Sequence, residues 1–203
     1  MITFPVLVGV VSWTGALFVV LAAVVVSVLA IRMKHPALAL FGLLPVGLGI
    51  LGLAFAVSVP ETPILPVLVA LGLAALGIVG GNPLAVWALQ RATRDDVDAG
   101  QHGGILIPET TPSGAKSATR KREVLRGGTW IGYLERVAIV GAIAVGRFEI
   151  IAAVIAIKGL GRFSELDSPE TRERFIIGTL VSMIWAGVCG ALIVLPELLP
   201  FSL

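Results

Sequence analysis

The sequence predicts an all-α protein, a polytopic transmembrane bundle of about six helices in which the fourth and fifth form a short, charged helical hairpin. Three observations predict this fold. The chain of 203 residues is 57% hydrophobic and only 14% charged, which leaves too little polar surface for a soluble domain. Its apolar residues form runs long enough to cross a bilayer, and its basic residues gather in the connections between them.

Three apolar runs in the N-terminal half each exceed the roughly 20 residues that cross about 30 Å of hydrocarbon. They are Phe4 to Ile31, Pro36 to Val59 and Ile64 to Leu89. We expect Pro45 to kink the second helix, because proline removes a backbone donor. The third run contains GGNP, Gly80 to Pro83, which resembles a helix start, so we expect that helix to be broken there.

A polar connection, residues 95–127, separates an N-terminal membrane half, residues 1–94, from a C-terminal half, residues 128–203. It is rich in Asp, Gly, Thr, Ser and Pro and ends in the basic run KSATRKREVLR. Such a length without an apolar period predicts a flexible, basic cytoplasmic loop. Its acidic start, DDVDAGQH, lacks the glutamate that completes a calcium loop, and we interpret it as a solvated charge run.

The stretch from Tyr133 to Lys158 has two interpretations. A single span, Val137 to Ile157, would bury Arg147 and Glu149 near the bilayer centre and would move the following basic loop to the outside. A turn at VGRFE instead gives two short helices, at about 130–145 and 148–161, with Arg147 toward the outer interface. We adopt the hairpin, followed by a last span at 175–195 that contains no charged residue.

The hairpin gives a consistent orientation with the N-terminus and the C-terminus outside. Among the basic residues only Arg147 then lies outside. The cytoplasmic set is Arg32, Lys34, Arg91, Arg94, the run Lys116 to Arg126, Arg136, Lys158, Arg162, Arg172 and Arg174. This distribution follows the tendency of Lys and Arg to remain in the cytoplasm.

The charges of the hairpin form a candidate polar cluster. Glu135 and Lys158 lie about three helical turns from the tip on opposite arms, so we expect an ion pair, which Arg162 joins from the same face as Lys158. Arg136 points about 100° away and is expected to face lipid. Two interpretations remain open: the cluster fixes the depth of the hairpin, or it lines a polar pocket for a substrate, proton or lipid headgroup.

The last helix carries small residues at every fourth position, which predicts a helix-packing stripe. The stripe consists of Gly178, Ser182, Ala186 and Gly190. Ala138, Ala142 and Gly146 repeat the spacing on the fourth helix, so we expect these two helices to pack together. The alternative is a chance pattern in a chain rich in Ala and Gly.

Motifs for catalysis, metal binding and nucleic-acid binding are not found in the sequence. It has no Ser-His-Asp set, no HExxH motif and no paired carboxylates in a polar span. The single Cys189 excludes an intrachain disulfide and a thiol metal cluster. Basic residues are not interleaved with aromatic ones, as a nucleic-acid surface would require. We therefore expect no enzyme activity, no cofactor and no nucleic-acid partner.

The C-terminal half contains the pattern Ile-Gly-x-Leu-Glu-Arg, then Lys with Arg-Phe, then Gly-Thr-Leu-x-Ser. Here these residues are Ile131, Gly132, Leu134, Glu135, Arg136, Lys158, Arg162, Phe163, Gly178, Thr179, Leu180 and Ser182. With this pattern the chain resembles a family of small multi-spanning bacterial inner-membrane proteins, and is most similar to actinobacterial members. The resemblance covers roughly the last 75 residues. It implies a plasma-membrane location and supplies no activity.

The sequence thus favours a non-enzymatic membrane protein that acts by contact, as an accessory, assembly or scaffold component of a cell-envelope complex. Its expected partners are the lipid bilayer and a membrane protein or a second copy of the chain. Packing stripes and a basic loop support this interpretation. The alternative is a small transporter or channel component, with a polar site at the short hairpin and a broken third helix.

Overall fold

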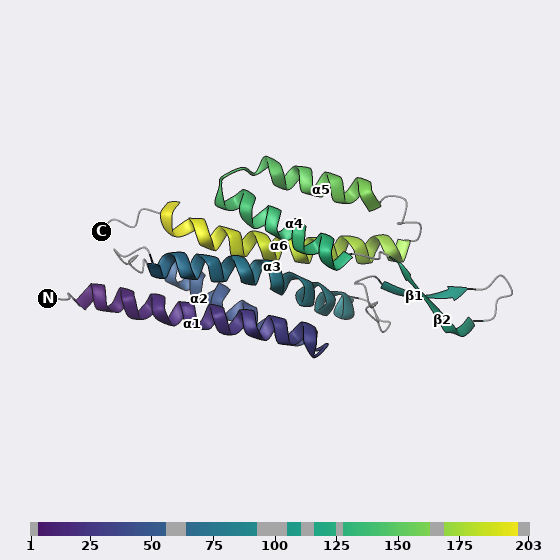
Figure 1. Cartoon of the computed structure of the whole chain (residues 1–203), viewed down its shortest axis with the longest axis horizontal. Coiled ribbons are helices and arrows are strands. Elements are labelled where there is room, and N and C mark those ends of the chain that lie inside the picture. Colours follow the sequence, from purple (N-terminus) through teal and green to yellow (C-terminus); the bar gives the residue numbers. More distant parts are fainter. Residues whose placement is uncertain are drawn as a thin grey trace.

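The computed structural model describes residues 4–55, 64–92, 105–110, 116–124, 128–162 and 169–198, and Figure 1 shows a helical bundle with a two-stranded ribbon at one end. The predicted fold class is confirmed, because the described chain contains six α-helices and one 3₁₀ helix. The helices are α1 (Phe4–Arg32), η1 (Pro36–Gly42), α2 (Leu43–Ala54), α3 (Ile64–Ala92), α4 (Gly128–Ala144), α5 (Glu149–Arg162) and α6 (Pro169–Leu198).

Four helical segments of the described chain are long and apolar enough to cross a membrane, which is the pattern of a multi-pass membrane protein. They are Leu7–Arg32, Pro36–Ala54, Ile64–Ala92 and Thr171–Pro196. Large apolar side chains such as Phe18 and Phe55 cover the outside of the bundle, as contact with lipid requires. At 1.5 Å per residue, α4 and α5 reach only about 25 and 21 Å and are shorter than these spans.

Helix α3 lies at the centre and packs against α1, α4 and α6. Glycines allow this close approach. A Cβ atom at Gly72 would lie 2.6 Å from Cγ1 of Val20 in α1, and one at Gly77 would lie 3.0 Å from Cβ of Cys189 in α6. Neighbouring helices therefore contact the backbone of α3 directly, which is the packing that small residues permit in membranes.

The expected break at Gly80 to Pro83 is wrong, since α3 continues through Pro83 to Ala92. A Cβ atom at Gly80 would lie 2.8 Å from Nε1 of Trp185, and one at Gly81 would lie 2.6 Å from Cδ of Arg136. The two glycines thus make room for side chains of α6 and α4. Tertiary packing keeps the helix continuous where the local pattern favours a new helix start.

The second apolar run forms two helices of different type. His35 is the N-cap of η1, and Pro36 occupies its first turn, as a helix start requires. The chain changes to α-helix at Leu43. Pro45 then lies in the first turn of α2, where the missing N–H removes no intrahelical hydrogen bond. The proline therefore coincides with a change of helix type.

Within residues 95–127, two segments form an antiparallel ribbon, β1 (Ile105–Thr110) and β2 (Lys116–Val124). Its register places Ile105 opposite Val124 and Ile107 opposite Arg122, with an irregularity between Pro108 and Thr110. The expectation of a connection without regular structure is wrong for these two segments. Branched residues of β1 favour extended backbone, and pairing satisfies the hydrogen bonds that an isolated strand would leave open. The acidic run at 95–102 lies outside the described residues.

Helices α4 and α5 are joined by a tight turn, and α5 folds back along α4 (Figure 1). Gly146 has φ +67°, a left-handed conformation that glycine adopts without steric cost. The N–H of Gly146 donates to the carbonyl of Ile143, and that of Arg147 donates to the carbonyl of Ala142. These two hydrogen bonds form a Schellman motif, which ends α4 and reverses the chain.

Candidate functional site: charged residues inside the bundle

Two consecutive charged residues of α4 are buried among the helices. Glu135 is 8% exposed and Arg136 is 3% exposed. Because neighbours on a helix point about 100° apart, they reach different partners. Glu135 faces α5, whereas Arg136 enters the junction of α3, α4 and α6. The charges therefore connect α4 to the helices around it.

Arg136 forms a clamp between three helices. Its Nε donates to the backbone carbonyl of Ile78 in α3 at 2.6 Å, and its Nη1 donates to Oγ of Ser182 in α6 at 2.7 Å. The guanidinium carbon also lies 5.0 Å from the ring centre of Tyr133. The expectation that Arg136 faces lipid is wrong. The planar guanidinium presents several donors at once, which suits it to bind acceptors on two helices.

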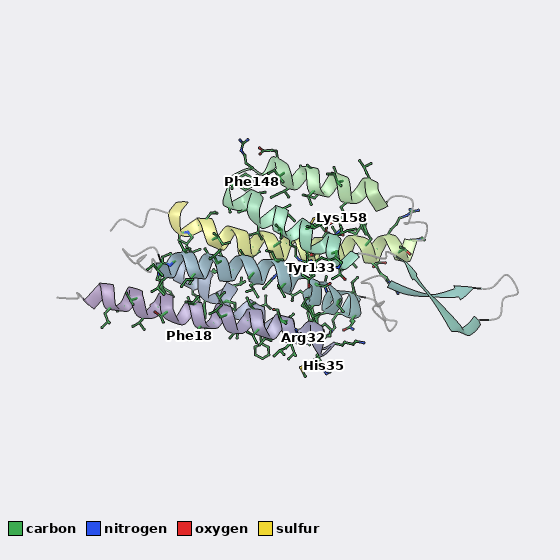
Figure 2. The ribbon with its side chains drawn as sticks, viewed as in Figure 1. Phe18, Arg32, His35, Tyr133, Phe148 and Lys158 are labelled. Atoms are coloured by element: carbon green, nitrogen blue, oxygen red, sulfur yellow. The ribbon has the colours of Figure 1, made fainter. Side chains whose placement is uncertain are left out.

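The structure brings Glu135 and Lys158 together. Nζ of Lys158 donates to Oε2 of Glu135, and the two side chains are only 16% and 9% exposed. Nζ of Lys158 also lies 5.8 Å from the ring centre of Phe175 in α6. Figure 2 shows Lys158 on the α5 arm, toward the end of the bundle that carries the ribbon. The buried ion pair joins α5 to α4 about three turns from the tip.

Arg162, the third member of the expected cluster, is the last residue of α5. Its side chain lies outside the described part of the structure, so its place in the cluster remains a prediction. The described pair is Glu135 and Lys158. No side chain of α5 at positions 149–161 is buried, and Lys158 is only partly exposed. Among the described residues, the ion pair between Lys158 and Glu135 is therefore the polar contact that attaches α5 to α4.

The small-residue stripe of α6 contacts both neighbouring helices. Ser182, Ala186 and Gly190 are buried. A Cβ atom at Gly190 would lie 3.0 Å from Cδ1 of Ile143 in α4, and one at Gly178 would lie 3.4 Å from Cδ1 of Leu89 in α3. On α4, Ala142 is buried. Gly146 follows the end of α4 and forms the turn, and beyond its two chain neighbours no described residue has an atom within 4 Å of its Cβ position.

Two polar atoms of this cluster have no hydrogen-bond partner among the described residues. They are Oε1 of Glu135 and Nη2 of Arg136. A buried acceptor and a buried donor each lose hydration free energy unless a small polar group reaches them. The cluster therefore retains one acceptor and one donor for such a group. The part of the chain that the structure describes holds no group of three or more His, Cys, Asp or Glu residues suited to a metal ion.

Several contacts of the site escape sequence reasoning. Gly81 and Gly132 both border the guanidinium, since a Cβ atom there would approach Arg136 within 2.6 and 3.2 Å respectively. Trp185 is buried, and its Nε1 donates to the carbonyl of Leu76 at 3.0 Å. The available signal was the Gly80–Gly81 pair, because two consecutive glycines suit close helix packing as readily as a helix break.

The residues of the C-terminal pattern divide by position. Gly132, Glu135, Arg136, Lys158 and Ser182 meet in or beside the buried cluster, whereas Ile131, Leu134 and Leu180 are exposed on the apolar surface. The pattern therefore contains both the polar contacts between helices and side chains on the outside of the bundle. Comparisons with protein-family models, with curated proteins and with solved structures find no match for the chain.

Proposed function

We propose that the protein is a non-enzymatic integral membrane protein that acts by contact, as an accessory, assembly or scaffold component of a cell-envelope complex. The observation that carries the proposal is the use of its buried charges. Arg136 binds α3 and α6, and Glu135 binds α5. These groups hold the protein's own helices in place, which is what a rigid contact platform requires.

The face of α5 supplies a contact surface. Its apolar side chains Ile157 and Leu160 lie about 60° apart around the helix and are 71% and 79% exposed. Helix α5 packs against α4 at the edge of the bundle and does not fill a core position. Helices in lipid associate through packing rather than through hydrophobic transfer, so a partner helix needs only a complementary surface here.

The proposed location is the bacterial plasma membrane, with both termini outside and residues 95–127 in the cytoplasm. The start of α1 and the end of α6 lie at one end of the bundle, and the ribbon lies at the other (Figure 1). The ribbon end also carries Arg32, and β2 contains KSATRKREV. The distribution of basic residues supports placing that end in the cytoplasm, where it would approach anionic lipid or a partner.

Affinity purification from the native membrane in a gentle detergent tests the proposal, with mass spectrometry and light scattering as readouts. A stoichiometric partner supports a contact function. The double substitution Ile157→Ala and Leu160→Ala should reduce its recovery at least fivefold. The matched control, Phe18→Ala and Val25→Ala, alters two exposed residues of α1 and should leave recovery unchanged. A monodisperse single chain or homomer that binds solute would contradict the proposal.

A small transporter or channel component is the second candidate, and the unpaired Oε1 of Glu135 and Nη2 of Arg136 favour it. Buried ionisable groups with free hydrogen-bonding capacity are typical of polar sites in membranes. Glu135→Gln keeps the size of the side chain and removes its charge. Normal accumulation and unchanged hydrogen exchange in α5, with loss of the cellular phenotype, would favour a polar site. Faster exchange in α5 or failure to accumulate would assign Glu135 a structural role.

A further inference from the structure

The turn between α4 and α5 carries an exposed ion pair on the outside of the bundle. Nη1 of Arg147 lies 3.0 Å from Oε1 of Glu149, and the two side chains are 69% and 65% exposed. Exposed apolar side chains flank the pair, namely Val145 and Phe148. In Figure 2, Phe148 lies at this turn, at the opposite end of α5 from Lys158.

The turn stops short of the end of the bundle. A Cβ atom at Gly77 of α3 would lie 3.3 Å from Cγ2 of Val140, which sets these two residues at the same level. From that level, α3 extends about 20 Å to its start, whereas α4 and its turn extend only about 9 Å to Gly146, at 1.5 Å per residue. The start of α3 therefore lies about 10 Å nearer the end of the bundle than Gly146 does. Figure 1 shows the same relationship, because the turn lies inward from the starts of α1 and α3. The Arg147–Glu149 pair is therefore recessed along the lipid-facing surface.

An exposed guanidinium and carboxylate at this depth need hydration or polar partners. Charged side chains within a bilayer are energetically unfavourable, and local thinning with entry of headgroups and water lowers that cost. The pair uses one Nη1 contact internally, which leaves other guanidinium donors of Arg147 available. Guanidinium groups bind phosphate oxygens in a bidentate geometry, and phosphate is the acceptor that every phospholipid supplies.

We propose that the α4–α5 turn draws a phospholipid headgroup below the surrounding membrane surface, with the lipid phosphate bound by Arg147. Glu149 faces the same headgroup and attracts its positively charged group electrostatically, so a zwitterionic phospholipid complements the pair. The short pair of helices acts as a site of local membrane thinning. Thinning lowers the hydrophobic barrier beside the protein, which is a physical activity beyond the proposed contact function.

Depth-dependent quenching tests the proposal with the full chain in phosphatidylcholine vesicles. A fluorescent thiol label is placed at Phe148→Cys in a Cys189→Ser background. The matched control is Phe18→Cys on α1. The Cβ position of Gly72 in α3 touches Val20 in α1, so these two residues lie at the same depth. Counted from that level at 1.5 Å per residue, Phe18 lies about 9 Å deeper in the membrane than the start of α3, which is close to the depth of the turn. Phe18 is exposed, and α1 carries no charged residue between Phe4 and Ile31.

Label at position 148 should be quenched at least twofold more by a headgroup nitroxide than by a mid-chain nitroxide, and label at position 18 should show the reverse order. Arg147→Gln should reverse the order at position 148, whereas Glu149→Gln should reduce headgroup quenching only partly. Preferential mid-chain quenching at position 148 in the unaltered turn would overturn the proposal. Protection of position 148 from both nitroxides would overturn the proposal too, because a second copy of the chain or a partner protein would then cover the turn. Size-exclusion profiles establish that each variant is folded.

Discussion

Arg136 and Ser182 are joined by a hydrogen bond of 2.7 Å between Nη1 and Oγ, which ties α4 to α6 inside the bundle. The preceding residue, Glu135, binds Lys158 on α5. One turn of α4 therefore carries both the clamp that holds the bundle together and the attachment of the outermost helix. The two functions separate by direction, because consecutive helical residues point to different neighbours.

Replacing Arg136 with Lys should destabilise the bundle. A single ammonium cannot reproduce the fork that reaches Ile78 and Ser182, so at least one buried acceptor loses its partner. We expect a loss of about 1 to 3 kcal/mol in unfolding free energy. Ser182→Ala should cost a similar amount, because it leaves Nη1 of Arg136 unpaired.

Thermal unfolding in detergent, followed by size-exclusion chromatography, measures both variants and the double variant. The double variant should cost less than the sum of the two single variants, since both changes remove the same hydrogen bond. Arg32→Ala is the control, because Arg32 is exposed at the end of α1. Strict additivity in this cycle would show that the Arg136–Ser182 contact does not contribute to stability.

The sequence predicted the architecture because lipid imposes simple rules. Apolar runs of sufficient length indicate helices, as Phe4 to Ile31 illustrates, and symmetry about a turn placed Glu135 beside Lys158. These inferences depend on local length and spacing. They need no knowledge of which faces of separate helices meet.

Arg136 and Gly81 illustrate what the sequence could not predict. Whether a charged residue near the end of a membrane helix reaches lipid or another helix depends on the rotation of that helix about its axis, which tertiary packing sets. Gly81 provides the space that admits the guanidinium, so burial of Arg136 depends on a residue 55 positions away. A local pattern that equally suits a helix break contained no information about that partner.

Glu135→Gln should loosen α5 without unfolding the bundle. No side chain of α5 at positions 149–161 is buried, so the ion pair with Lys158 makes a large contribution to its attachment. We expect amide hydrogen exchange in α5 to accelerate about tenfold, which corresponds to about 1.4 kcal/mol. Exchange in α1 should stay unchanged. The exchanged pair Glu135→Lys with Lys158→Glu should recover much of the protection, and equal exchange in all variants would refute this role.

Gly80→Ala should destabilise the packing of α3 against α6. Its Cβ atom would lie 2.8 Å from Nε1 of the buried Trp185, which donates to the carbonyl of Leu76. We expect a loss of about 1 to 3 kcal/mol, as in other overpacked cores. Gly47→Ala is the matched control in α2, because nothing lies within 4 Å of its Cβ position. Unfolding midpoints in detergent compare the two, and an equal effect at both positions would count against a close helix contact at Gly80.

Cysteine labelling tests the orientation of the chain. Phe148→Cys in a Cys189→Ser background keeps Arg147 and should react with a membrane-impermeant thiol reagent added outside intact cells, because the turn of α4 and α5 is proposed to face the exterior and Phe148 is exposed there. Arg32→Cys, at the opposite end of the bundle in Figure 2, should react only after the membrane is permeabilised. This contrast controls for leakage and for the exposure of each site. Labelling of position 148 from the cytoplasm alone would invert the proposed topology. Failure to label even after solubilisation would show that the turn is enclosed by protein.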